Sequence, residues 1–169
     1  WSLINSGGAA TSLTRRYHTL WFDHGPSPAD ASYAYAILPG ASPEQTQTYA
    51  ATPEFTIVEN SSGAHAVTES TLGITAVNFW TNASHTSGGI TSDRVVTILV
   101  QRRENTLDIA LADPTQSNTP IHLELDSEVG AVIEKDERIS VDQSTPTLKL
   151  TIQPQSVRGG TLRAQFTRP

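Results

Sequence analysis

Residues Tyr17–Pro39, YHTLWFDHGPSPADASYAYAILP, form the densest run of apolar and aromatic residues in the chain, and we expect the fold to be organised around them. The run holds two segments of strand character, Tyr17–His24 and Ser32–Leu38, and the second alternates large and small side chains as a pleated strand does. Between them, Gly25, two prolines and Asp30 favour turns, and the prolines cannot donate to a ladder. We therefore predict an antiparallel pair of strands joined by a loop, with its aromatic rings in a sheet core.

The rest of the chain is dominated by short strand signals. Each segment is alternating or β-branched and is bounded by Asn, Asp, Gly, Ser or Pro. The predicted strands are Glu54–Val58, Ala64–Thr68, Ile74–Thr81, Arg94–Gln101, Thr106–Ala112, Ile121–Asp126, Leu148–Gln153 and Thr161–Thr167. Many short strands separated by turn residues predict an all-β fold, an antiparallel β-sandwich or barrel.

One short helical segment is expected before these strands. Ser42 suits the N-cap, Pro43 the first helical position, and Gln45 completes a capping box three residues after Ser42. The pattern predicts a helical turn that runs from there to about Ala50.

A change in composition suggests two subdomains. Residues 81–93, TNASHTSGGITSD, are rich in Ser, Thr and Gly. All Trp and Tyr residues precede this stretch, and most of the charge follows it. We predict a boundary here, with one domain at 1–91 and a second at 92–169, and we expect the first to be more deeply buried against something else.

Composition argues against two classes of partner. The chain has 169 residues and a formal net charge of -6, and its only adjacent basic pairs are Arg15–Arg16 and Arg102–Arg103. A non-specific nucleic-acid binder needs clustered basic residues, so no nucleic-acid partner is expected. No apolar run approaches the roughly 20 residues that cross a bilayer, so no membrane partner is expected either.

Two residue types are missing from the sequence. Without Cys there is no disulfide, thiolate or zinc-thiolate chemistry. There is also no Met, and the chain begins at Trp1 without a signal-like apolar segment, so we expect a processed or excised piece of a longer protein.

The histidines give no sign of a metal site. His18 and His24 would share one face of a strand, but six residues of strand is about 20 Å, so they cannot bind one ion. Asp23 and His24 are neighbours on a strand and would face opposite sides of the sheet, which argues against a catalytic dyad. We expect His24 to close its strand and bond the following turn, and we expect no metal and no cofactor.

The acidic residues could form many carboxylate pairs, but the sequence does not show which pair, if any, is catalytic. Glycoside hydrolysis needs two carboxyl groups that face each other across a cleft, and the sequence cannot select such a pair. The clusters Glu124–Asp126 and Glu134–Glu137 are interpreted as solvated strand edges, where charge discourages pairing with other chains.

The basic pair Arg15–Arg16 is the candidate substrate-binding site. It directly precedes an aromatic strand, and an arginine beside exposed rings can hold an acidic sugar through bidentate hydrogen bonds to the carboxylate and stacking on the pyranose. A surface pair at a strand entrance, without function, is the alternative.

The chain carries, in this order, the motifs DHG (23–25), YAY (33–35), LP (38–39), NFW (78–80) and DPTQ (113–116). This set of motifs resembles the late part of polysaccharide lyase family 8, which includes hyaluronate, chondroitin AC and xanthan lyases. The order and spacing of DHG, YAY, LP, NFW and DPTQ make the resemblance specific, and it weakens after Gln116. The residues that carry it are Trp1, Ile4, Asn5, Tyr17, Leu20, Asp23, His24, Gly25, Pro28, Tyr33, Ala34, Tyr35, Leu38, Pro39, Ala41, Ser42, Tyr49, Asn60, Ala66, Val67, Asn78, Phe79, Trp80, Ala112, Asp113, Pro114, Thr115 and Gln116.

The resemblance implies a location within a larger secreted bacterial enzyme. In that family an N-terminal α/α toroid carries the catalytic residues, and a large antiparallel β-sandwich and a smaller C-terminal β-domain follow. Residues 1–91 would be the end of the central sandwich and 92–169 the C-terminal domain. The reaction is β-elimination on a uronate-bearing polysaccharide. No catalytic residue of the family maps onto this chain, which implies that it is inactive alone, supports the toroid and forms one wall of the cleft.

A second hypothesis is a free-standing carbohydrate-binding module. Exposed rings at Trp1, Trp21 or Trp80 would then stack on sugar.

Overall fold

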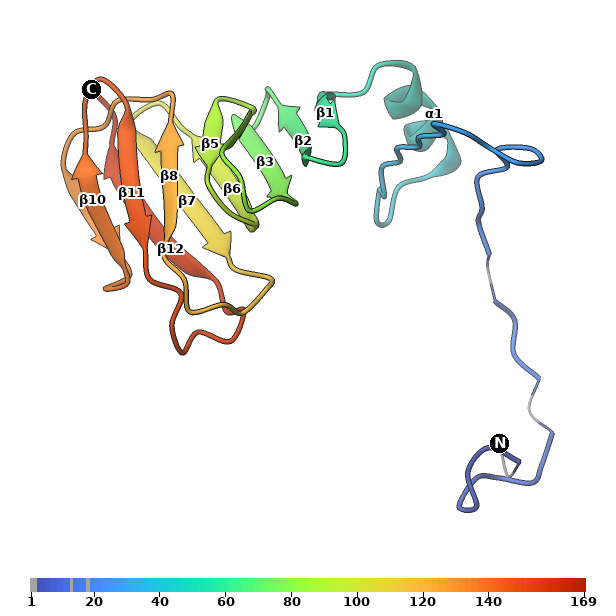
Figure 1. Ribbon diagram of the computed structural model, residues 1–169. Helices are drawn as coiled ribbons and strands as arrows, with labels where there is room; N and C mark the ends of the chain where they lie inside the picture. The colour runs from blue at the N-terminus through green and yellow to red at the C-terminus, as the bar shows by residue number, and fades with distance from the viewer. Residues whose placement is uncertain (1–2, 13, 18) are drawn as a thin grey trace. The chain divides into compact units, whose positions relative to one another are not determined.

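The computed structural model describes residues 3–12, 14–17 and 19–169. By its internal contacts the chain falls into two units, Trp1–Ile37 (unit 1) and Leu38–Pro169 (unit 2) (Figure 1). Trp1 and His18, which entered the sequence interpretation, lie outside the described residues.

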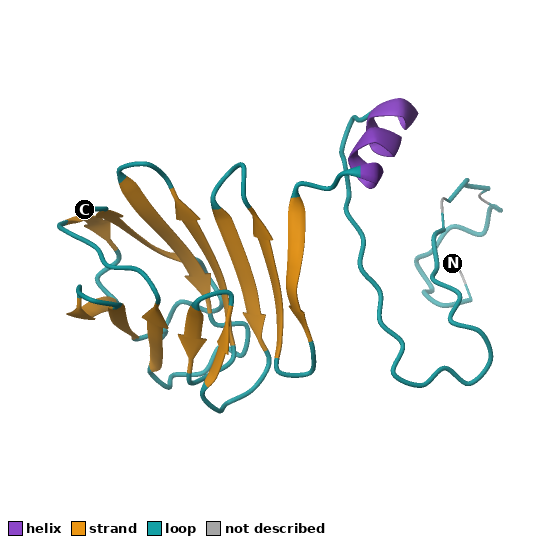
Figure 2. Ribbon diagram, turned by 90° about the horizontal axis from the view of Figure 1, so that it is seen from above, coloured by secondary structure: helices purple, strands orange, loops and turns teal. Residues whose placement is uncertain are grey.

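Unit 2 contains one helix and twelve strands among the described residues, and Figure 2 distinguishes them by colour. None of the described helices is long and apolar enough to cross a membrane. In chain order the elements are α1 (Pro43–Ala51), β1 (Phe55–Asn60), β2 (Ala64–Glu69), β3 (Ile74–Phe79), β4 (His85–Ser87), β5 (Ile90–Ser92), β6 (Val96–Arg102), β7 (Thr106–Ala112), β8 (Ile121–Leu125), β9 (Val132–Lys135), β10 (Ile139–Gln143), β11 (Leu148–Ile152) and β12 (Leu162–Thr167).

The strands form two antiparallel sheets. One has seven strands in the order β1-β2-β3-β6-β7-β12-β9, and the other has five in the order β10-β11-β8-β5-β4. A single core cluster takes residues from both sheets, so the sheets pack face to face as a β-sandwich. The all-β prediction is confirmed, and a strand is found at each of the eight predicted positions after Pro53.

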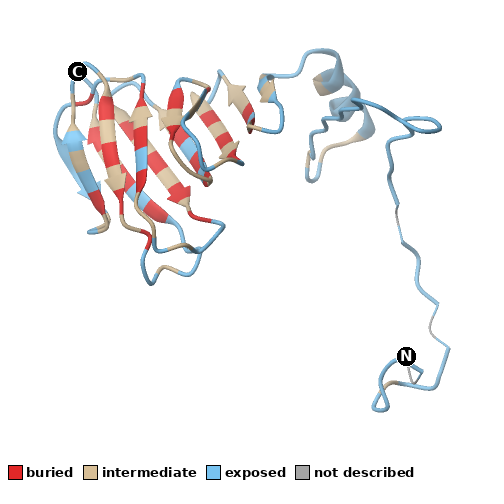
Figure 3. Cartoon of the chain, in the orientation of Figure 1, coloured by how far each residue is buried: buried red, intermediate tan, exposed pale blue. Residues whose placement is uncertain are grey.

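The core follows from the period of two in the strands. In β6 the buried residues are Val96, Ile98 and Val100, and in β12 Leu162 and Phe166 are buried in the same alternation. Figure 3 shows this as bands of buried residues along the strands of both sheets. Apolar side chains on one face of each strand therefore form the interior, and the other faces are left for polar contacts.

Helix α1 begins as the sequence predicts. The backbone N–H of Gln45 donates to the Ser42 hydroxyl (3.2 Å), and the backbone N–H of Ser42 donates to Gln45 Oε1 (2.7 Å), which completes the capping box. Pro43 occupies the first helical position. No residue of α1 is buried, so the caps rather than packing define where the helix starts.

The predicted strand pair at Tyr17–His24 and Ser32–Leu38 is wrong. The described residues of unit 1 form no strand, and no described residue before Ala64 is buried, so the aromatic rings are not a core. A two-stranded ribbon has little stability without further strands or a covering element, and within unit 1 neither is present among the described residues.

The predicted boundary between residues 91 and 92 does not separate two domains. β3 pairs with β6 in one sheet and β5 pairs with β8 in the other, so strands from both sides of residue 91 share each sheet. The stretch 81–93 holds the β4–β5 hairpin, in which Ser87, Ile90 and Ser92 are buried. The expectation that residues 1–91 are more deeply buried against something else stays a prediction.

Of the two acidic clusters predicted to lie at sheet edges, Glu134–Glu137 begins on an edge strand and Glu124–Asp126 does not. All four residues of β9, which include Glu134, are exposed, and β9 is an edge strand. Glu124 instead lies on β8, which pairs with β11 on one side and β5 on the other. The interpretation of Glu124–Asp126 as a strand edge is therefore wrong.

Candidate functional site

The aromatic residues of unit 1 gather where the chain reverses. The ring of Phe22 stacks on that of Tyr33 at 4.9 Å between centroids, and Tyr33 stacks on Tyr35 at 6.4 Å. The backbone N–H of Gly25 donates to Asp23 Oδ1 (2.9 Å), and Gly25 takes a positive φ of 74°. The two halves of the segment therefore do meet, through rings and a turn rather than a β-ladder.

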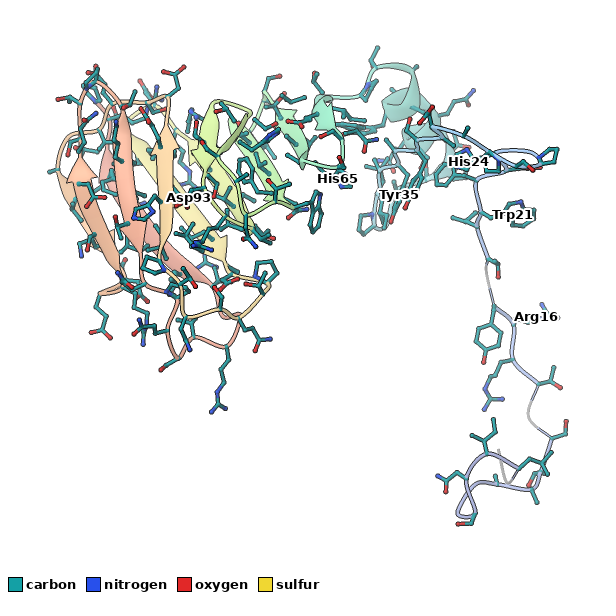
Figure 4. All side chains as sticks on the ribbon, viewed as in Figure 1. Arg16, Trp21, His24, Tyr35, His65 and Asp93 are labelled. Atoms are coloured by element: carbon teal, nitrogen blue, oxygen red, sulfur yellow. The ribbon has the colours of Figure 1, made fainter. Side chains whose placement is uncertain are left out.

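His24 does not have its predicted part in this turn. Asp23 provides the side chain that bonds the turn, while the His24 ring lies 6.4 Å from both Phe22 and Tyr33. His24 therefore belongs to the ring cluster; it is labelled in Figure 4.

The apolar rings of unit 1 are open to solvent. Tyr17 is 85% exposed, Trp21 is 78% exposed and Tyr35 is 66% exposed. Large apolar surface of this extent on a chain marks a place where another molecule or chain segment packs. The segment therefore offers stacking faces to a sugar or a contact surface to a protein.

Arg15 and Arg16 lie on an extended part of unit 1, and Arg16 is labelled in Figure 4. Both are exposed, and Arg15 donates from its guanidinium to the carbonyl of Thr14 (3.0 Å). Neither pairs with a carboxylate of the described residues, so both guanidinium groups can meet an anionic ligand. Their role in substrate binding stays a prediction.

A second exposed ring lies on the sandwich. Trp80 directly follows β3 and is 46% exposed, and its ring meets that of His65 edge-on at 5.4 Å between centroids. His65 on β2 pairs with Asn78 on β3, on the outer face of the seven-stranded sheet. Figure 4 labels His65 at this position. Trp80 is the one tryptophan among the described residues of unit 2.

Glu59 joins the two sheets near this position. Its Oε1 accepts from the Ser61 hydroxyl (2.5 Å), and it lies 2.9 Å from Nε2 of His85 on β4. The hydrogen bond from Ser61 is the largest cause that lowers the pKa of Glu59 to about 2, and the Ser87 hydroxyl and His85 lower the pKa further. A Cβ on Gly63 would come within 2.9 Å of the His85 ring, which explains the glycine in this turn.

Asp93 and His122 form a second carboxylate–imidazole pair. Asp93 Oδ2 lies 2.7 Å from His122 Nδ1, and Asp93 Oδ1 accepts from the backbone N–H of His122 (2.8 Å). The pair ties β8 to the residue that follows β5, and Asp93 is labelled in Figure 4. Its geometry serves strand alignment.

Sequence reasoning missed both of these pairs. Glu59 and His85 are 26 residues apart, and Asp93 and His122 are 29 apart, so no local spacing signals either contact. Among the described residues no three His, Asp or Glu side chains gather as a metal site would require.

Two family models match the chain. The polysaccharide lyase family 8 super-sandwich domain matches residues 1–50, and the polysaccharide lyase family 8 C-terminal beta-sandwich domain matches residues 56–122. The division between the two models lies next to the start of β1, which agrees with a sandwich that begins at Phe55.

Two known polysaccharide lyases match nearly the whole chain. Xanthan lyase of Bacillus sp. (strain GL1) is 37% identical over 170 residues, which cover 98% of this chain and 18% of that protein. Hyaluronate lyase of Thermasporomyces composti is 31% identical, with 97% of this chain and 21% of that protein covered. The chain thus spans about a fifth of the length of these curated relatives.

A solved structure agrees with this assignment. The X-ray structure of the chondroitin AC lyase of Streptomyces coelicolor A3, in complex with chondroitin sulphate, matches with a TM-score of 0.83 at 33% identity. The match covers 100% of this chain and 22% of that one. The chain therefore belongs to polysaccharide lyase family 8, within its super-sandwich and C-terminal β-sandwich regions.

Proposed function

We propose that this chain is the non-catalytic β-structured portion of a secreted bacterial lyase that degrades an acidic polysaccharide such as hyaluronan, chondroitin or xanthan. The observation that carries the proposal is coverage: almost all of this chain matches xanthan lyase, but only 18% of that enzyme is matched. Secretion belongs to the proposal because such a polymer has to be cut before a cell can take it up.

The reaction assigned to the whole enzyme is β-elimination. A base removes the proton α to a uronate carboxylate, donors stabilise the developing charge, and an acid protonates the departing glycosidic oxygen. In the described part of this chain, His85 and His122 are each engaged with a carboxylate that joins strands. This supports a chain that is inactive alone, with the chemistry in a helical catalytic portion.

The exposed rings of unit 1 support a contact with that catalytic portion. Trp21 and Phe22 are 78% and 51% exposed, and burying a ring stabilises a complex by about 2 kcal/mol. Arg15 and Arg16 precede these rings, and in the proposal they lie on one wall of the cleft, where a guanidinium would bind a uronate carboxylate.

The experiment is assembly with the helical catalytic portion of the same enzyme. We expect the two to co-purify and expect hydrogen exchange across residues 17–37 to slow in the complex. Trp21→Asp should weaken assembly at least tenfold, while Trp80→Asp, an equal change on the sandwich, should not. Absence of a complex, or equal exchange in this segment with and without the catalytic portion, would contradict the proposal.

A carbohydrate-binding module is the second candidate, and the exposure of Trp80 beside His65 favours it. A ring that is half exposed on a sheet face can stack on a pyranose. If this reading holds, the isolated chain binds an anionic polysaccharide and Trp80→Ala abolishes binding. Unchanged affinity in Trp80→Ala would remove the candidate.

A further inference from the structure

The outer face of the seven-stranded sheet carries a groove of about 270 Å³. It crosses β6, β7, β12 and the edge strand β9, on the side of the sheet that faces away from the core. Its apolar floor includes Leu99 and Ala110, which are directly opposite each other on β6 and β7. Leu99 is 40% exposed, so a large apolar side chain is open to solvent there.

Polar side chains line up beside this floor. Gln101, Asp108, Gln165 and Glu134 are consecutive partners across β6, β7, β12 and β9, so they form one row on the outer face. In the neighbouring row, Leu99 pairs with Ala110, and Ala110 pairs with Arg163 on β12, so the guanidinium lies at the end of the apolar floor. Flat amide, carboxylate and guanidinium groups thus surround an apolar surface on two sides.

The row is held in position by its own hydrogen bonds. Asp108 Oδ1 accepts from Gln165 Nε2 (2.5 Å), and its Oδ2 accepts from Arg103. Arg103 also donates to Gln101 Oε1 (2.6 Å), and Gln101 donates to the carbonyl of Leu72 (3.2 Å). These bonds balance the charge of Asp108 and fix the amides, which lowers the entropic cost of binding a ligand.

Arg163 is the group that the network leaves available. It is exposed, and it forms no ion pair with a carboxylate of the part of the chain that the structure describes. Glu134 is also exposed, on the edge strand β9 that pairs with β12. The groove therefore offers donors and acceptors together, with no net excess of either sign among Arg103, Arg163, Asp108 and Glu134.

We propose that this groove binds a pyranose unit of an oligosaccharide, at a site separate from the exposed rings of unit 1. A sugar ring has an apolar face that fits Leu99 and Ala110, and its hydroxyls both donate and accept, as the amide, carboxylate and guanidinium groups require. A volume slightly below the roughly 300 Å³ of small-molecule pockets suits a single ring unit. Metal binding is a poorer match, because Asp108 already accepts from Arg103 and Gln165, and no three His, Asp or Glu side chains of the described residues gather here.

The test is titration of the isotope-labelled full chain with an unsulphated chondroitin tetrasaccharide, followed by NMR and calorimetry. We expect amide shifts at residues 99–103, 108–110 and 163–165. Arg163→Ala should weaken binding about tenfold, since it removes a charged hydrogen-bond donor. Leu99→Asp should abolish binding, because a carboxylate replaces the apolar floor.

Matched variants make the outcome decisive. Lys149→Ala removes a positive charge on the other sheet, where Lys149 lies 3.6 Å from Glu124, and should leave the affinity unchanged. Equal affinity in Arg163→Ala and the wild type, shifts centred on Trp80, or no binding at millimolar tetrasaccharide would overturn the assignment. This titration does not require assembly with a catalytic portion. A failure of the groove proposal can therefore be told apart from a failure of the proposed function.

Discussion

At Glu59 one carboxylate holds two sheets together, and its charge is central to that contact. Glu59→Gln removes the charged acceptor for Ser61 and His85, and we expect the free energy of unfolding at pH 7 to fall by about 1 kcal/mol. Urea unfolding of the wild type and of Glu59→Gln measures this difference in free energy. Glu104→Gln, in the exposed turn between β6 and β7, is the matched control and should be neutral.

The same carboxylate predicts a pH dependence. The pKa of Glu59 in the folded chain is about 2, below its usual 4.5, so its contribution to stability is complete above pH 4.5. It is lost as the pH falls from 4.5 toward 2, because protonation removes the acceptor that the folded state favours. The difference in unfolding free energy between wild type and Glu59→Gln should shrink over this interval. A difference that stays constant down to pH 2 would refute the assignment.

Gly73 is a position where backbone conformation and close packing coincide. Its φ is +65°, and a Cβ there would lie 2.2 Å from the carbonyl oxygen of Arg102. Gly73→Ala should destabilise the sandwich by about 2 kcal/mol or more, through both strain and displacement of β6. Gly89→Ala shares the positive φ (+73°) but has its nearest neighbour at 3.8 Å, so it should cost only about 1 kcal/mol. Equal unfolding midpoints for the two variants would show that the contact is unimportant.

At the scale of the element, α1 depends on its N-terminal cap. Ser42→Ala removes the acceptor for the Gln45 N–H, and we expect helix stability to fall by about 1 kcal/mol. Amide hydrogen exchange of residues 46–51 should accelerate about fivefold. Thr46→Ala, which leaves both capping bonds in place, is the control and should not accelerate it. No change in Ser42→Ala would mean that contacts other than the cap maintain the helix.

Elements with a clear period could be predicted from sequence. The alternation in β6, β7 and β12 reflects one buried and one open face, and it is visible in the residues themselves. β9 is exposed at every position, so no alternation marks it, and β4 and β5 are three residues each within a Ser, Thr and Gly stretch. Unit 1 shows the opposite error: its aromatic residues have strand character in the sequence, but the part of the unit that the structure describes contains no strand.

At the scale of the whole molecule, stability resides in the sandwich. Among the described residues, the whole hydrophobic core lies between Ala64 and Phe166, within unit 2. We expect a chain of residues 38–169 to unfold in urea at the midpoint of the full chain, within error, since no described residue of unit 1 belongs to the core. A markedly lower midpoint would show that unit 1 contributes to the fold of this chain.

The candidate site was predictable only in part, because its parts come from distant segments. Arg15 and Arg16 stand out as adjacent cations before an aromatic run. The row from Gln101 to Glu134, by contrast, exists only through strand pairing across four strands, and no spacing in the sequence reveals it. Family membership followed from motifs such as NFW and DPTQ, which record ancestry rather than geometry.

The central claim is that this chain supports a lyase without catalysing the reaction, and the initial rate of unsaturated uronate formation tests it most directly. The rate is followed by ultraviolet absorbance with an acidic polysaccharide as substrate. We predict no product from this chain alone, and a faster rate from the helical catalytic portion with this chain than without it. Product formed by the isolated chain, or an unchanged rate on its addition, would contradict the account.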